Sequence, residues 1–150
     1  MAYQAKREKK CIEDLELVNE NGEVEKTIHV ELDAGAVVQK LSLKYIALLR
    51  AQQEAAGISA GIDTAEDVQG AYMKLGQAVT DIMAAVFGEE DAGYIVDFYS
   101  SNYVEMVKQV VPFISDVVIP KVRKVAQENK QDILNRYNRK TRREMKRRMR

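Results

Sequence analysis

Residues 87–124 read FGEEDAGYIVDFYSSNYVEMVKQVVPFISDVVIPKVRK, and this stretch decides the fold of the chain. Its apolar and aromatic residues recur at helical spacing around a Ser-Ser-Asn break at residues 100–102. The acids that follow Gly88 are typical of a helix start, where negative charge is favourable. The stretch therefore predicts one helix after Gly88 and another after the break. Because proline removes a backbone donor and clashes with the preceding turn, we expect a kink at one of Pro112 and Pro120 or a new helix start at either.

Two further helices are indicated on the amino-terminal side of this stretch. Ser42 is the expected N-cap of the first, and Gly57 is placed to end it in a left-handed conformation, followed by a loop. Thr64 begins a capping-box-like start for the second, whose apolar residues then follow helical spacing. Gly70 and Gly76 lie inside that second helix. They either weaken it or allow a neighbouring element to approach closely.

Residues 11–32 have the alternating pattern of a β-hairpin. Leu15 and Leu17 alternate with acids, and Ile28 to Leu32 alternate again after an Asn-Glu-Asn-Gly turn at residues 19–22. An isolated hairpin is only marginally stable in water. We therefore expect this hairpin to pack on helices or to pair with another sheet.

The predicted fold class is mainly α (α+β). We predict a single domain over residues 1–120, made of the hairpin at 11–32 and a helical body at 42–120, followed by a basic helical tail at 121–150. A chain of 150 residues is long enough for one domain with a real core. Charged residues interrupt its most apolar window, so no membrane span is expected. The polar amino terminus lacks the apolar core of a secretory signal, and the single cysteine is typical of a reducing cytoplasm.

The net charge of zero conceals two oppositely charged parts. Residues 121–150 hold 13 of the 23 Lys and Arg residues and three of the 23 acids, so they carry +10 and residues 1–120 carry −10. Such a basic tail is often an interaction segment, with nucleic acid, an acidic protein or the acidic body of a second copy as its partner. A solvated helix end that binds nothing is the alternative. Apolar or weakly polar residues recur every four positions along the tail and give it a thin stripe: Ile133, Tyr137, Thr141, Met145 and Met149.

The chain shows no pattern of catalytic or metal-binding residues. His29 is the only histidine and alternates with apolar neighbours, so we expect it at the surface without a catalytic partner. Cys11 is expected to be a small packed residue. The acidic clusters fit helix starts and lack the spacing of a calcium loop, and no phosphate-binding glycine motif occurs. We therefore expect a protein that is not an enzyme and that uses no cofactor or metal.

The order of three motifs, FGEE, NYVEMV and VPFISDVVIPK, resembles the tail assembly chaperones of long-tailed bacteriophages and prophages of Gram-positive bacteria. The resemblance is clearest over residues 64–124. It implies a mostly helical protein that acts in the cytoplasm of the bacterial host and is absent from the mature virion. It implies that the chain binds the tape measure protein, keeps it soluble and helps to recruit tail tube subunits. It supplies no catalytic residues.

A chaperone for a long helical rod needs apolar grooves and a weak, reversible grip, and self-association along the rod would add avidity. We expect the partner-binding surface to come from the proline-containing segment and the tail: Phe98, Tyr103, Met106, Phe113, Ile119, Arg136, Tyr137, Arg143 and Arg147. For the first five of these residues, burial in the core is the competing interpretation.

Two other function classes stay open. A small nucleic-acid-binding accessory protein would act through the basic tail, with salt-sensitive affinity. The acidic body and the lack of any recognised nucleic-acid-binding module argue against it. A structural tail component would instead remain in finished particles.

Overall fold

The computed structural model describes the backbone of residues 2–59 and 64–148, and the side chains of residues 2–57 and 64–143. The described elements follow in the order β1 (Cys11–Val18), β2 (Val24–Leu32), α1 (Ala34–Ser59), α2 (Ala65–Phe87), α3 (Glu89–Phe98), α4 (Tyr103–Gln109), the π-helix η1 (Phe113–Val118) and α5 (Ile119–Arg148). The prediction of a mainly helical chain with an amino-terminal hairpin and a carboxy-terminal helix is confirmed.

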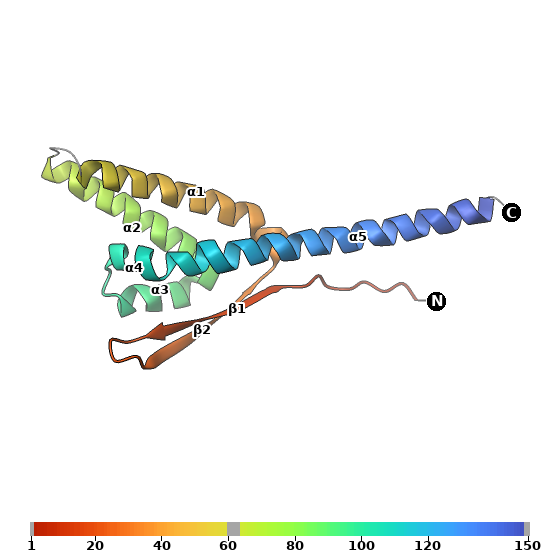
Figure 1. Ribbon diagram of the computed structural model, residues 1–150, viewed down its shortest axis with the longest axis horizontal. Coiled ribbons are helices and arrows are strands. Elements are labelled where there is room, and N and C mark those ends of the chain that lie inside the picture. Colours follow the sequence, from red (N-terminus) through yellow and green to blue (C-terminus); the bar gives the residue numbers. More distant parts are fainter. Residues whose placement is uncertain (1, 60–63, 149–150) are drawn as a thin grey trace.

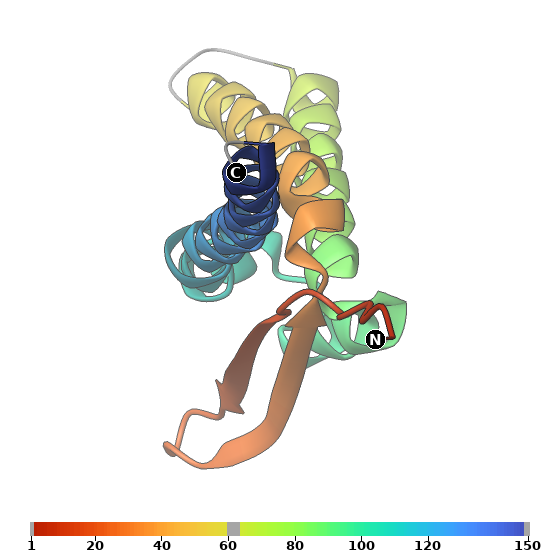
Figure 2. The same ribbon diagram turned by 90° about the vertical axis from the view of Figure 1, so that its right-hand side faces the viewer.

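The helices form a body from which one helix extends. α1 and α2 make an antiparallel pair, α5 packs along α1, and α3 and α4 close the end of the body near the hairpin turn (Figure 1). The hairpin lies below most of the helical body in both views (Figure 1 and Figure 2), and it contacts α2, α5 and η1. The carboxy-terminal part of α5 projects beyond the body, and both chain termini lie at that end (Figure 1).

The hairpin is held by a well-formed turn and by burial of one face. Asn19 accepts hydrogen bonds from the backbone N–H groups of Asn21 and Glu23 at 3.0 Å, and Gly22 takes the left-handed φ of 82° that the turn requires. Cys11 and Leu17 of β1 and Ile28 and Val30 of β2 are buried in the core, while the alternate residues face out. The residues 19–22 therefore form the turn that the sequence predicts.

Local capping signals fix two of the helix starts. The side chain of Thr64 accepts a hydrogen bond from the N–H of Asp67 at 3.2 Å, and Asn102 accepts one from the N–H of Glu105 at 3.1 Å. Each interaction satisfies a donor that a helix start leaves unpaired. Ser100 and Ser101 have positive φ values of 52° and 59°, which turn the chain sharply between α3 and α4. The break predicted at residues 100–102 is confirmed.

The predicted ends of the first helix are wrong. α1 begins at Ala34, and Ser42 lies inside it, where its hydroxyl donates to the carbonyl of Val38 at 2.9 Å instead of capping a helix start. Gly57 also lies within α1, and the helix continues to Ser59. Leu41 and Leu48 share one buried face, so packing extends the helix past both local signals. The remainder of the expected loop falls at residues 60–63, outside the described part of the chain.

The helix type changes beside both prolines, where the sequence predicts a kink or a new helix start. η1 begins directly after Pro112, and the N–H of Ile119 at its end donates to the carbonyl of Ile114, five residues earlier. Pro120 follows in the first turn of α5, where it has no N–H to offer. The wider π-helical turn therefore takes up the irregularity that Pro120 imposes, and α5 continues from it.

The two glycines of α2 have different surroundings, which gives a matched test of packing. A Cβ on Gly76 would lie 2.6 Å from Cε2 of Tyr103, whereas a Cβ on Gly70 would meet nothing within 4 Å. We expect Gly70→Ala to raise the free energy of unfolding by about 1 kcal/mol through helix propensity. Gly76→Ala brings the same gain in helix propensity, but overpacking against the Tyr103 ring lowers the free energy of unfolding by about 1–3 kcal/mol. We therefore expect Gly76→Ala to be the less stable of the two variants.

Urea denaturation followed by circular dichroism measures both effects. In a Tyr103→Ala background the two glycine substitutions should act alike, because the clashing ring is gone. An equal gain from both substitutions in the natural background would contradict the close packing of Tyr103 on α2.

Candidate functional site

The part of α5 that projects from the body is named here the arm and comprises residues 130–148. Every side chain described on it, from 130 to 143, is exposed. Residues 130–143 carry six Lys or Arg residues and one acid, Asp132. Residues 6–9 line a hollow with Asp132, Ile133 and Arg136 at the start of the arm. A helix with so little packing gains little stability from the body, so burial places few demands on its sequence.

The arm also presents apolar surface to solvent. Ile133, Leu134 and Tyr137 lie within about one turn of one another and are between 45% and 69% exposed. Thr141 follows in the same stripe, and its hydroxyl donates to the carbonyl of Tyr137 at 3.0 Å. The arm therefore combines exposed bases with exposed apolar side chains.

A single amide marks the point where the arm leaves the body. Asn129 is 6% exposed and is the one polar residue buried among those described. Its Oδ1 accepts from the backbone N–H of Lys9 at 3.2 Å, and its Nδ2 donates to the carbonyl of Lys9 at 3.1 Å. The amino-terminal segment is thereby tied to α5, and it places three bases and one acid beside the start of the arm: Lys6, Arg7, Lys9 and Glu8.

A second contact fixes α5 on the hairpin. The Nζ of Lys121 donates to the carbonyl of Ile12 and to Oε1 of Glu13, each at 2.7 Å. The hydrogen bond to Glu13 raises the pKa of the Lys121 ammonium, so this group stays charged. The basic tail predicted at 121–150 therefore begins inside the body, where Val122 and Val125 are buried, and its exposed part begins at residue 130.

The predicted partner-binding residues fall into two separate groups. Met106 and Ile119 are buried, and the three aromatic residues pack against the core with part of each ring exposed: Phe98, Tyr103 and Phe113. Phe98 meets Tyr99 edge-on at 4.9 Å, and Phe113 stacks on Phe87 at 6.1 Å between ring centroids. These five residues therefore fit the competing interpretation, core packing, in this conformation.

The second group lies on the arm. Arg136, Tyr137 and Arg143 are exposed there, and the backbone of Arg147 continues the same helix. The side chain of Arg147 is outside the described part of the chain. Among the side chains that the structure describes, those of the arm and those of the five apolar residues do not form one surface.

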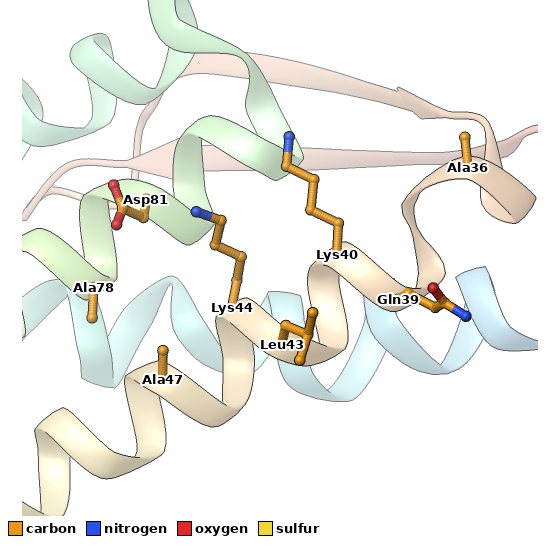
Figure 3. Close-up of a pocket in the computed structure, with 8 residues that line it drawn as sticks. All are labelled: Ala36, Gln39, Lys40, Leu43, Lys44, Ala47, Ala78 and Asp81. Atoms are coloured by element: carbon orange, nitrogen blue, oxygen red, sulfur yellow. The ribbon is translucent and has the colours of Figure 1, made fainter.

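A groove between α1 and α2 is absent from the sequence-based prediction. It has a volume of about 590 Å³ and is lined by three alanines, one leucine, two lysines, one glutamine and one aspartate: Ala36, Gln39, Lys40, Leu43, Lys44, Ala47, Ala78 and Asp81 (Figure 3). Leu43 is 68% exposed in it. The sequence did hold one sign of an exposed apolar residue on α1. Leu41 and Leu43 are about 200° apart on a helix, so they cannot share one buried face.

The two residues weighed for chemistry from the sequence, His29 and Cys11, have contrasting surroundings. His29 is exposed and its Nδ1 lies 2.7 Å from Oδ1 of Asp14, while burial raises the pKa of the Cys11 thiol and disfavours its reactive thiolate. No group of three or more His, Cys, Asp or Glu residues among those described could hold a metal ion. None of the described helices is long and apolar enough to cross a membrane.

Comparison with known proteins adds no relative. No protein-family model matches the chain, and neither a curated protein nor a solved structure matches it significantly.

The contact of Asn129 with Lys9 predicts local protection of the amino-terminal segment. Asn129→Ala removes both hydrogen bonds, each with a net value of about 0.5–1.5 kcal/mol, so we expect the Lys9 amide to exchange with solvent on the order of 10–100-fold faster. Hydrogen exchange of the native protein measures this rate.

A matched control is Asn135→Ala on the arm. Asn135 accepts a hydrogen bond from Gln131 at 3.2 Å and lies beyond the contact with Lys9. An Asn129→Ala variant with unchanged exchange at Lys9 would show that another contact holds the segment.

Proposed function

We propose that this chain is a non-enzymatic phage tail assembly chaperone that acts in the host cytoplasm. In this role it binds the tape measure protein, keeps it soluble and helps to recruit tail tube subunits. The sequence support is the resemblance carried by the FGEE, NYVEMV and VPFISDVVIPK motifs of residues 87–121. The structural support is the arm.

The observation that carries the proposal is the exposed apolar patch on the projecting arm. A tape measure protein is a long helix whose apolar faces are uncovered before assembly, and an exposed helix face is suited to cover such a surface. Ile133 and Tyr137 supply the apolar contact, and the neighbouring arginines add electrostatic attraction that weakens with salt. A grip made of few apolar groups is weak enough to be displaced by tube subunits.

Nucleic-acid binding through the arm is the second candidate function. The six bases within residues 130–143 favour it, because phosphate contacts dominate such binding. The two functions differ in what they require of the arm. A protein partner requires the apolar patch, whereas a phosphate backbone requires the charges.

The test is co-expression with the tape measure protein of the same phage or prophage, scored by the amount of that protein that stays soluble and co-purifies. Two variants separate the functions. An apolar variant carries Ile133→Gln, Leu134→Gln and Tyr137→Gln, and a charge variant carries Arg136→Gln, Arg139→Gln and Arg143→Gln. We expect the natural chain to rescue the tape measure protein and the apolar variant to lose most of the rescue.

A chain ending at residue 129 provides the truncation control, because it keeps Val122, Val125 and Asn129 in the body. Absence of rescue by the natural chain would refute the chaperone proposal. Co-purification of nuclease-sensitive nucleic acid, lost in the charge variant and retained in the apolar variant, would favour the second function.

A further inference from the structure

The groove between α1 and α2 continues into a second hollow. The second hollow encloses about 340 Å³ and shares Ala47, Ala78 and Asp81 with the first. Together the two linings run from residue 36 to residue 54 of α1. At 1.5 Å per residue this is about 27 Å, the length of a helix of about 18 residues.

The floor of the groove suits close approach by another helix. Ala47 of α1 and Ala78 of α2 face each other across it (Figure 3). Because their side chains are small, the axis of an incoming helix can lie near those of α1 and α2, at the distances typical of packed helices. Leu43 stands at the edge with most of its side chain uncovered and offers an anchor for an apolar partner.

The rim of the groove is basic, although residues 1–120 carry a net charge of −10. Its two linings contain four bases and two acids: Lys40, Lys44, Arg50, Lys74, Glu54 and Asp81. Lys74 pairs with Glu54 at 3.5 Å. Lys44 points toward Asp81 (Figure 3), but neither it nor Lys40 or Arg50 forms an ion pair with another described residue.

These charges decide between occupants. The arm of a second copy has an apolar patch, but its bases would face the basic rim. Two copies packed groove to groove would likewise oppose like charges. An amphipathic helix whose apolar stripe is edged by Asp and Glu complements both the floor and the rim.

We propose that the α1–α2 groove is a docking site for an amphipathic helix of a partner protein, with carboxylates along the edges of its apolar face. The site lies on the body and is separate from the arm. It therefore gives the chain a second binding surface. This surface favours acidic partners, whereas the acidic remainder of the body repels them.

Two labelled synthetic peptides of about 18 residues test the proposal, a length set by the helical rise along the groove. They share one Leu and Ala face, and one peptide has Glu at the flanking positions where the other has Lys. Fluorescence anisotropy with the full chain measures their binding. We expect the Glu peptide to bind at least about tenfold more tightly than the Lys peptide, a difference of about 1.4 kcal/mol.

Substitutions in the full chain locate the binding. Leu43→Asp should weaken binding of the Glu peptide about tenfold or more. Met73→Asp is the matched control, because Met73 is 67% exposed, lies on α2 outside both linings and receives the same new charge. Exchanging Lys40 and Lys44 for Glu should reverse the preference in favour of the Lys peptide, which loss of folding cannot mimic.

Three results would overturn the proposal. The first is that neither peptide binds. The second is that Leu43→Asp and Met73→Asp weaken binding equally. The third is that the charge variant of the arm (Arg136→Gln, Arg139→Gln and Arg143→Gln) loses binding of the Glu peptide while Leu43→Asp keeps it. The last result would place the acidic peptide on the arm.

Discussion

The first turns of α5 are packed between α1 and the hairpin, and the positions of the hairpin and of the arm depend on this packing. Val122 and Val125 are buried there, and Lys121 holds both the backbone and a side chain of β1. Because α5 is one continuous helix to Arg148, the contacts that fix its first turns also aim the arm. The arm is about 28 Å long, so a small rotation of the packed first turns of α5 moves the tip of the arm by several ångströms.

Local chemistry made part of the fold predictable from the sequence. The hairpin turn and the caps at Thr64 and Asn102 depend on side chains that bond backbone groups a few residues away, and each lies where the pattern indicates. The ends of α1 were not predictable in this way. Ser42 and Gly57 are plausible local signals, but burial of the face that carries Leu41 and Leu48 outweighs them.

In the candidate site too, features made by consecutive residues were predictable and features made by packing between segments were not. The charge and stripe of the arm are properties of consecutive residues, so the sequence is sufficient to find them. Periodicity also places Met106 and Ile119 on an apolar face, but it does not say whether that face meets this chain or another, and here it meets this chain. The α1–α2 groove depends on how two helices sit against each other. No single segment contains that information. The sequence indicates the groove only through Leu43, which cannot share the buried helix face of Leu41.

The tie between Asn129 and Lys9 has a consequence for the order in which the chain can fold. It joins groups 120 positions apart, and the contact of Lys121 with Ile12 spans 109 positions. The hairpin is synthesised early, but its apolar face gains the cover of α5 only after residues 119–129 have emerged, roughly 5–20 s after Leu32 at ordinary rates of translation. Contacts of such long sequence separation slow folding. During this interval the strand edges and the inner residues of β1 and β2 are open to other nascent chains. The outward-facing acids Asp14, Glu16 and Glu31 disfavour pairing between copies, because like charges repel.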